Sequence, residues 1–153
     1  MEDLRLKKYT DDYYEFVYET KKNAYKKYVC ECWGAWVEED QRNHFVRFIN
    51  VCRENTYIVE YDGKDIGFYN YLILEDGTYE IGNICINKEY QGMGLGTKLL
   101  NRILEENKDK DIKLQFFKQN RVGSLYKRLG FVMCGETEYH YQMVKHKQSN
   151  LVK

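Results

Sequence analysis

The spacing of the apolar side chains changes twice along this chain, and the changes separate helical from extended segments. Two sets of side chains between residues 13 and 52 each fall on one helical face: Tyr13, Phe16, Val17, Thr20 and Ala24, then Phe45, Phe48, Ile49 and Cys52. Residues 56–86 instead form short β-branched and aromatic runs separated by turns that contain glycine, which is typical of a strand meander. Helical spacing then returns with Leu95, Leu99, Leu100, Ile103 and Leu104.

The complete pattern predicts an α+β fold with a mixed sheet. The predicted elements are a strand at 4–6, helices at 13–24 and from 40 to 52, strands at 56–61, 66–74 and 78–86, a helix from 95, a strand at 112–117, a helix with its apolar face at 122–129, and strands at 131–134 and 139–145. Residues 30–36 are expected to be irregular. Asn120 is the predicted N-cap of the last helix, and Gly130 its predicted left-handed end.

Composition limits the kind of protein this is. The 153 residues suit one domain, expected at 1–145, followed by a polar tail at 146–153. Lysine plus arginine and aspartate plus glutamate both total 24, so no excess positive charge favours nucleic acid as a partner. No apolar run reaches membrane-spanning length, and the charged N-terminus lacks the core of a signal peptide. Five cysteines without zinc or disulfide spacing indicate free thiols, no metal and a cytoplasmic location.

Three alternating glycines, Gly92, Gly94 and Gly96, immediately precede the helix that starts near Leu95. Without Cβ atoms, backbone N–H groups there can converge on an anion at the positive end of the helix dipole, so a phosphate or pyrophosphate is the expected ligand. The spacing fits neither the P-loop nor the dinucleotide-binding fingerprint. A flexible loop with a glycine cap is the alternative.

The same segment resembles the acyl-CoA signature of the GNAT superfamily of N-acetyltransferases. That signature, Gln/Arg-x-x-Gly-x-Gly/Ala, is matched by Gln91, Gly94 and Gly96. The run 120–131 resembles the second family signature, Asn-x-x-Ala-x-x-Leu-Tyr-x-x-Leu-Gly-Phe, with Gly123 in place of the alanine. The resemblance covers nearly the whole chain. It implies a central mixed, mostly antiparallel sheet of six to seven strands flanked by about four helices, with a splayed parallel strand pair that forms the acyl-CoA cleft.

The resemblance also implies how acetyl-CoA would be held, as cosubstrate and without a metal. The pyrophosphate would lie on the amides of Gly92 to Thr97, the pantetheine arm would pair with Ile84 and Ile86, and an N–H near Cys85 would stabilise the oxyanion. The implied cofactor-binding residues are Ile84, Cys85, Ile86, Gln91, Gly92, Met93, Gly94, Leu95, Gly96, Thr97, Asn120 and Tyr126.

Two side chains match catalytic positions of the family. Tyr126 corresponds to the tyrosine that protonates the departing thiolate, although it also completes an apolar helix face. Glu80 stands in the register of a general-base glutamate, since an ammonium must lose a proton before it attacks, although it could equally be an exposed strand carboxylate. Asn120 could bind the pantetheine, cap its helix, or do both. Cys85 as a nucleophile is a weaker alternative to direct transfer.

The expected activity is N-acetylation of a primary amine, by direct attack in a ternary complex. The acceptor stays open among small-molecule amines and peptide or protein amines, and neither nucleic acid nor a membrane is expected as a partner. A homodimer is compatible with the resemblance. The alternative function is a non-catalytic domain that binds acyl-CoA as a sensor or assembly module.

Overall fold

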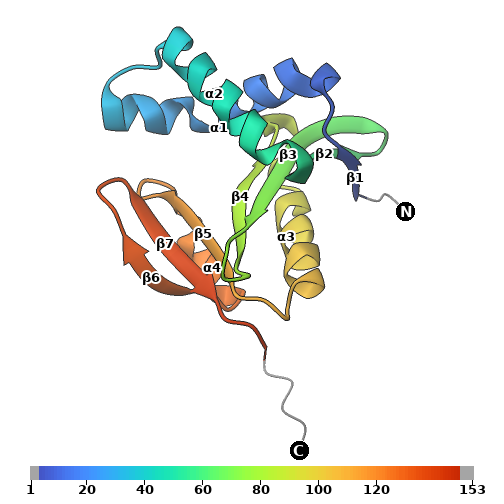
Figure 1. The fold of residues 1–153 in the computed structure, drawn as a ribbon, viewed down its shortest axis with the longest axis vertical. Helices are drawn as coiled ribbons and strands as arrows, with labels where there is room; N and C mark the ends of the chain where they lie inside the picture. The colour runs from blue at the N-terminus through green and yellow to red at the C-terminus, as the bar shows by residue number, and fades with distance from the viewer. Residues whose placement is uncertain (1–3, 149–153) are drawn as a thin grey trace, which may run out of the picture. The chain divides into compact units, whose positions relative to one another are not determined.

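The computed structural model describes residues 4–148. Its elements are β1 (Leu4–Lys8), α1 (Tyr14–Trp33), α2 (Glu38–Cys52), β2 (Thr56–Tyr61), β3 (Lys64–Ile73), β4 (Tyr79–Ile86), α3 (Leu95–Glu106), β5 (Ile112–Phe117), α4 (Gly123–Arg128), β6 (Val132–Glu136) and β7 (His140–Lys145) (Figure 1). The strands form a seven-stranded sheet in the order β1-β2-β3-β4-β5-β7-β6. β4 and β5 are a parallel pair, registered at Tyr79↔Ile112 and Glu80↔Lys113. The expected mixed, mostly antiparallel α+β fold is confirmed.

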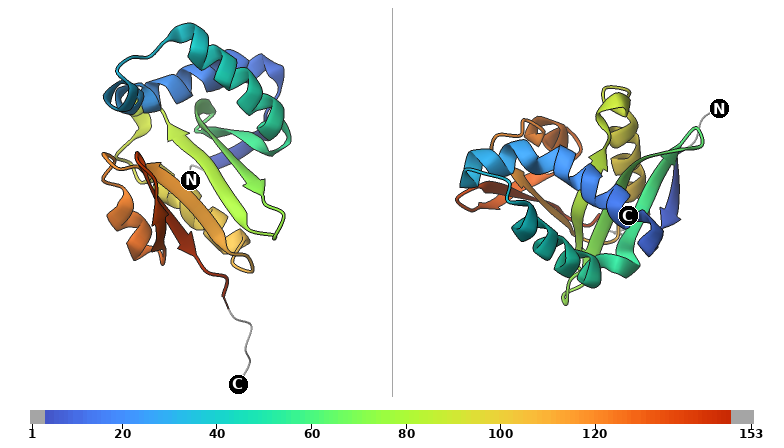
Figure 2. Two further views of the ribbon diagram at one scale, coloured as in Figure 1. Left: turned by 60° about the vertical axis from the view of Figure 1, so that its left-hand side comes forward. Right: turned by 90° about the horizontal axis from the view of Figure 1, so that it is seen from above.

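The chain divides into two compact units, and the first comprises the residues up to 71 together with 83–99. In this unit α1 and α2 cover the same face of β2, β3 and β4 (Figure 2). Their shared core is Tyr9, Val17, Tyr18, Phe45, Ile49, Ile58, Phe68 and Cys85. The two helical stripes therefore meet the sheet where the sequence periodicity placed them, and the end of β4 lies beneath α1.

The second unit comprises residues 72–82 and the chain from Leu100 onward. β7 pairs antiparallel with both β5 and β6. The short helix α4 ends in a Schellman motif, in which the Phe131 amide donates to the Tyr126 carbonyl at 3.0 Å and the Gly130 amide donates to the Lys127 carbonyl at 3.1 Å. Gly130 adopts φ +104° there, which confirms its predicted left-handed conformation.

The first helix is longer than predicted. Residues 30–33 were expected to be irregular, but they form the last turn of α1. The helix continues to Gly34, the first glycine after its start, which has φ +91° and donates its amide to the Cys30 carbonyl. α2 begins at Glu38, two residues before the predicted start at Asp40.

The prediction that Asn120 caps the last helix is wrong in its position. α4 begins at Gly123, and the Asn120 side-chain oxygen instead accepts the Val122 amide at 3.1 Å, in the turn that precedes the helix. The side chain therefore shapes the entry to α4, in the manner of an Asx turn.

The predicted polar tail begins as a bonded segment. The Lys147 amide donates to the Asp111 carboxylate at 2.8 Å, and the Gln148 amide donates to the Lys108 carbonyl at 2.9 Å. Residues 149–153 of that tail lie outside the described residues. Across residues 4–148, no helix has both the length and the hydrophobicity to cross a membrane.

Candidate functional site

The glycine-containing segment before α3 forms an open turn at the start of that helix. Gly92 and Gly94 have φ of +80° and +78°, a region that side-chain-bearing residues rarely adopt. The Lys98 amide donates to the Gly94 carbonyl, so the amides of residues 95–97 belong to the first turn, where helices have no acceptor of their own. A Cβ at Gly92, Gly94 or Gly96 would meet no atom within 4 Å. These amides therefore border space that a ligand can fill.

Two hydrogen bonds fasten the residues that follow β4, one to the end of β4 and the other to β3. The Gln91 side-chain amide donates to the Ile86 carbonyl at 2.8 Å, and the Asn87 amide donates to the Ile66 carbonyl on β3 at 2.7 Å. Gln91, predicted to bind the cofactor, thus also holds the loop in place, a role that the sequence did not indicate. Ile86 and Gln91 are brought together at the same point of the first unit.

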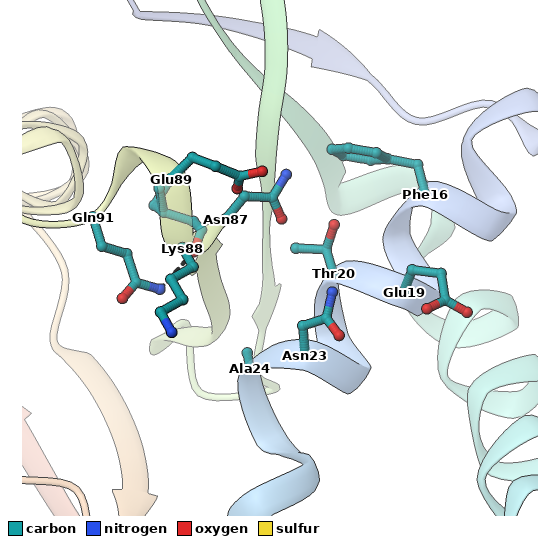
Figure 3. Close-up of a pocket in the computed structure, with 10 residues that line it drawn as sticks. Phe16, Glu19, Thr20, Asn23, Ala24, Asn87, Lys88, Glu89 and Gln91 are labelled. Atoms are coloured by element: carbon teal, nitrogen blue, oxygen red, sulfur yellow. Dashed lines mark hydrogen bonds between the residues drawn. The ribbon is translucent and has the colours of Figure 1, made fainter.

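A cavity of about 760 Å³ adjoins this point, entirely within the first unit (Figure 3). One wall is the segment Ile86, Asn87, Lys88, Glu89 and Gln91, and the other is the α1 face Phe16, Glu19, Thr20, Asn23 and Ala24. Its size is that of a small-molecule site. The cavity therefore unites two predicted cofactor residues with a helix wall that includes three residues of the predicted apolar face, Phe16, Thr20 and Ala24.

A chain of polar side chains fixes β4 just before Cys85. The Tyr25 hydroxyl donates to the Asn83 side-chain oxygen at 2.8 Å, and the Asn83 amide donates to the side-chain oxygen of Asn70 at 2.9 Å. Asn70 is 1% exposed, so this contact satisfies a polar group in the core. Sequence analysis did not identify Asn70 or Asn83 as functional residues, and it did not predict the hydrogen bond between Tyr25 and Asn83. The sequence signal that could have identified them is the presence of Asn70 and Asn83 inside predicted strands, where asparagine is uncommon.

Burial makes Cys85 a poor nucleophile. The thiol is 3% exposed, and this burial raises its pKa to about 11, against the smaller opposing effects of Tyr25 and of the Lys21 charge. The reactive form of a cysteine is the thiolate, which is therefore scarce at neutral pH. Lys21 lies over the Tyr25 and Phe48 rings, and its own pKa is lowered by burial. The burial of Cys85 thus argues against its use as a nucleophile.

The remaining predicted residues occupy distinct positions. Ile84 is half-buried on β4, Leu95 is buried at the start of α3, and Met93 is exposed. Glu80, Asn120 and Tyr126 belong to the second unit. Glu80 lies opposite Lys113 in the register of β4 and β5, and the centroid of the Tyr126 ring lies 5.5 Å from that of Phe116. Their roles toward a cofactor stay predictions. Within the described part of the chain, no three histidine, cysteine or acidic side chains are grouped to hold a metal ion.

A comparison of the sequence with models of known protein families identifies the family of this chain. A family model described as an acetyltransferase (GNAT) domain matches residues 52–133, which is more than half of the chain and includes β4, the glycine segment and α3. The chain belongs to the GNAT acetyltransferase family. The family resemblance drawn from the two sequence signatures is therefore confirmed.

This GNAT chain is similar to two curated relatives over part of its length. It is 31% identical over 100 residues to a probable spermine N(1)-acetyltransferase of Bacillus subtilis subsp. natto, a match that covers 58% of this chain and 66% of the relative. It is 33% identical over 86 residues to a 5-NmdU N-acetyltransferase of Pseudomonas phage PaMx11, covering 53% and 59% of the two chains. These matches span less than two thirds of each relative.

A solved GNAT structure extends the similarity to nearly the whole chain. The PaiA N-acetyltransferase of Thermoplasma acidophilum in complex with coenzyme A superposes with a TM-score of 0.66 at 20% identity, and the match covers 94% of this chain and 99% of that one. At this identity the similarity concerns the fold.

Proposed function

We propose that this chain transfers an acetyl group from acetyl-CoA to a primary amine by direct attack of the amine on the thioester. The observation that carries the proposal is the open turn before α3. Gly92 and Gly94 hold positive φ angles directly before the first-turn amides, and a Cβ added at either glycine would meet no atom within 4 Å. Such a site suits a pyrophosphate, the doubly charged centre of coenzyme A.

The neighbouring residues suit the rest of that molecule. The amides of Gly92 to Thr97 would bind the pyrophosphate, and the edge of β4 at Ile84 and Ile86 would pair with the pantetheine arm. A backbone N–H near Cys85 would donate to the oxyanion, and the hydrogen-bonded Asn83 beside it holds the strand in position. The cavity of about 760 Å³ next to Ile86 would then admit the amine.

Proton transfers are assigned to two residues of the second unit. Glu80 would accept a proton from the ammonium form of the acceptor, directly or through water, because only the free amine is nucleophilic. Tyr126 would donate its proton to the thiolate that leaves. Asn120, whose side-chain oxygen binds the Val122 amide, would contribute a polar contact to the pantetheine arm through its amide nitrogen.

A thermal-shift titration with acetyl-CoA, free CoA and NADH tests the cofactor. A ligand at about 100 times its Kd adds roughly 2.7 kcal/mol of stability, which corresponds to a rise in Tm of roughly 5–10 °C for a chain of this size. We expect that rise with acetyl-CoA and CoA and none with NADH. Amine-dependent release of CoA thiol would then separate catalysis from binding alone, and no Tm shift at millimolar acetyl-CoA would overturn the proposal.

Replacing Tyr126 with phenylalanine should lower kcat at least about tenfold, because a general acid would be lost. Tyr126 packs against Phe116 and against Phe131, with ring centroids 5.5 and 5.7 Å apart, and phenylalanine keeps both contacts. Tm and the affinity for acetyl-CoA should therefore stay unchanged. Steady-state kinetics and binding measurements check both expectations.

Tyr141→Phe is the matched control for that substitution. The Tyr141 ring lies 5.9 Å from the same Phe116 ring, so this variant also removes a hydroxyl from the same aromatic cluster. We expect its kcat to equal that of the wild type. If Tyr126→Phe turns over as fast as Tyr141→Phe, then Tyr126 has only a packing role.

A further inference from the structure

A second, smaller cavity lies between α1 and α2, entirely within the first unit. Its volume is about 80 Å³, enough for a few waters or one small anion, and it shares no lining residue with the cavity beside Ile86. The described residues that line it include aromatic rings and two lysines but neither aspartate nor glutamate. They are Tyr18, Lys21, Lys22, Trp36, Gln41, His44, Phe45 and Phe48.

Lys21 brings an ammonium group to this lining without an oxygen atom to accept its hydrogens. The group lies 5.1 Å from the centroid of the Tyr25 ring and 5.5 Å from that of the Phe48 ring. Across residues 4–148 it makes neither a hydrogen bond nor an ion pair, and burial lowers its pKa because no carboxylate offsets the loss of water. A cation removed from water without an oxygen partner is costly, so its position at a cavity points to a ligand that supplies the partner.

Other lysines of the chain show how such a group is ordinarily completed. Within residues 4–148, three further lysines lie over an aromatic ring, and each of them also binds an oxygen atom. The pairs are Lys7 with the Asp65 carboxylate at 2.7 Å, Lys8 with the Glu54 carbonyl at 2.7 Å and Lys118 with the Glu136 carboxylate at 2.8 Å. Lys21 therefore differs from the other ring-bound lysines in what it lacks, an oxygen, and not in its contact with the rings.

The Trp36 indole adds a second donor to the same cavity. Its Nε1 atom is buried, and no group in the described part of the chain lies in hydrogen-bond geometry with it. The nearby carboxylate of Glu38 is already engaged, because it accepts the Tyr18 hydroxyl and the Lys22 ammonium group. A buried N–H without an acceptor costs stability. Two unsatisfied donors, one of them cationic, call for a ligand that accepts hydrogen bonds and carries negative charge.

We propose that the cavity between α1 and α2 binds a small monocarboxylate, with one oxygen on the Lys21 ammonium group and the other on the Trp36 indole N–H. A carboxylate only accepts hydrogen bonds, has two oxygens and carries one negative charge, which matches the two donors and the single uncompensated cation. A short aliphatic part, such as the methyl group of acetate, would lie against the Phe45 and Phe48 rings. The site does not depend on the proposed acetyl transfer, although α1 forms a wall of both cavities.

The two tryptophans of the chain allow a direct test, because Trp36 lines the cavity and Trp33 does not. Each indole N–H gives one signal in a proton–nitrogen correlation spectrum, and Trp33→Phe assigns the pair. We expect sodium acetate to move the Trp36 indole proton downfield until the site is saturated, because a hydrogen bond to a charged acceptor forms. The signal of Trp33, which is 55% exposed, should not follow that curve.

Sodium chloride at equal ionic strength is the control for the ligand. A halide is a single atom, which offers the rings no aliphatic part and cannot place separate oxygens on the two donors. If chloride moves the Trp36 signal as far as acetate does, the cavity accepts any small anion and the assignment to a carboxylate is wrong. If acetate produces no saturable movement, water alone fills the cavity and the proposal is overturned.

Lys21→Met tests the cation, and Lys26→Met is its matched control, since it removes the same charge from an exposed position of the same helix. Lys21→Met should weaken acetate binding at least about tenfold, whereas Lys26→Met should bind acetate as the wild type does. Acetate at about ten times its Kd should raise the Tm of the wild type and of Lys26→Met by roughly 3–5 °C, and that of Lys21→Met by less. Equal acetate affinity of Lys21→Met and the wild type would overturn the proposal, and the wild-type spectrum decides the question if Lys21→Met does not fold.

Discussion

Gly94→Glu is expected to weaken acetyl-CoA binding at least about 100-fold, a loss of about 2.7 kcal/mol. Gly94 has φ +78°, and a Cβ there would meet no protein atom within 4 Å. The new side chain would therefore occupy the space assigned to the pyrophosphate. Its carboxylate would also repel that group at the helix end where an anion is otherwise favoured. Titration of the folded variant with acetyl-CoA measures the loss.

Gly94→Ala separates charge and bulk from backbone strain. Both substitutions place a Cβ at a positive φ, which costs roughly 1–2 kcal/mol for an L-residue. Only glutamate adds a carboxylate and a chain long enough to fill the turn. We expect Gly94→Ala to bind acetyl-CoA with no more than a tenfold loss. Equal affinity of Gly94→Glu and the wild type would show that the turn before α3 does not hold the pyrophosphate.

Gly67→Ala should destabilise the chain by about 3 kcal/mol, lowering Tm by about 6–12 °C. Gly67 is buried in β3, and a Cβ on it would lie 2.0 Å from the Cys85 carbonyl oxygen and 3.0 Å from the Ile86 Cα. These are backbone atoms of β4, so no rotation of a side chain can relieve the clash. The two strands would have to separate at the point assigned to the thioester. Acetyl-CoA affinity should therefore fall as well.

Gly96→Ala is the stability control for Gly67→Ala. Gly96 lies in the first turn of α3, and a Cβ on it would meet nothing within 4 Å. Alanine also favours a helix more than glycine does, so Tm should not fall. Calorimetric or fluorescence melting of both variants gives the comparison. A Tm of Gly67→Ala within 2 °C of that of the wild type would contradict the close approach of β3 and β4.

Local sequence patterns predicted the strands more accurately than the ends of the helices. β2 and β5 have the predicted bounds, Thr56–Tyr61 and Ile112–Phe117, because their apolar runs end at residues that break a strand. α1 continues past the predicted boundary as far as Gly34, which is the first glycine after its start and ends the helix in a left-handed conformation. α4 starts later than its Asn120 signal because that side chain bonds the preceding turn instead. Helix ends depend on such single contacts.

The candidate site was predictable only in part, for a similar reason. The glycine spacing predicted a turn at the start of a helix, and the structure places Gly92 and Gly94 there with the required φ angles. The residues of the α1 wall were not predicted to line a cavity, because Phe16, Thr20 and Ala24 stand on the apolar face of the helical pattern. Periodicity identifies which face of a helix is buried, but a cavity beneath that face depends on the packing of distant segments. The Tyr25–Asn83–Asn70 chain is likewise a tertiary contact between α1, β3 and β4.

The uneven burial of the five cysteines determines how product release can be followed. Cys52 and Cys85 are buried, Cys30 and Cys32 are half-buried, and Cys134 on β6 is exposed. A chromogenic disulfide reagent added to detect liberated CoA will therefore first consume one protein thiol per chain, at Cys134, and leave the thiol nearest the thioester site untouched. Cys134→Ser removes that background while keeping β4 intact, so the variant yields a reaction trace in which the colour comes from CoA.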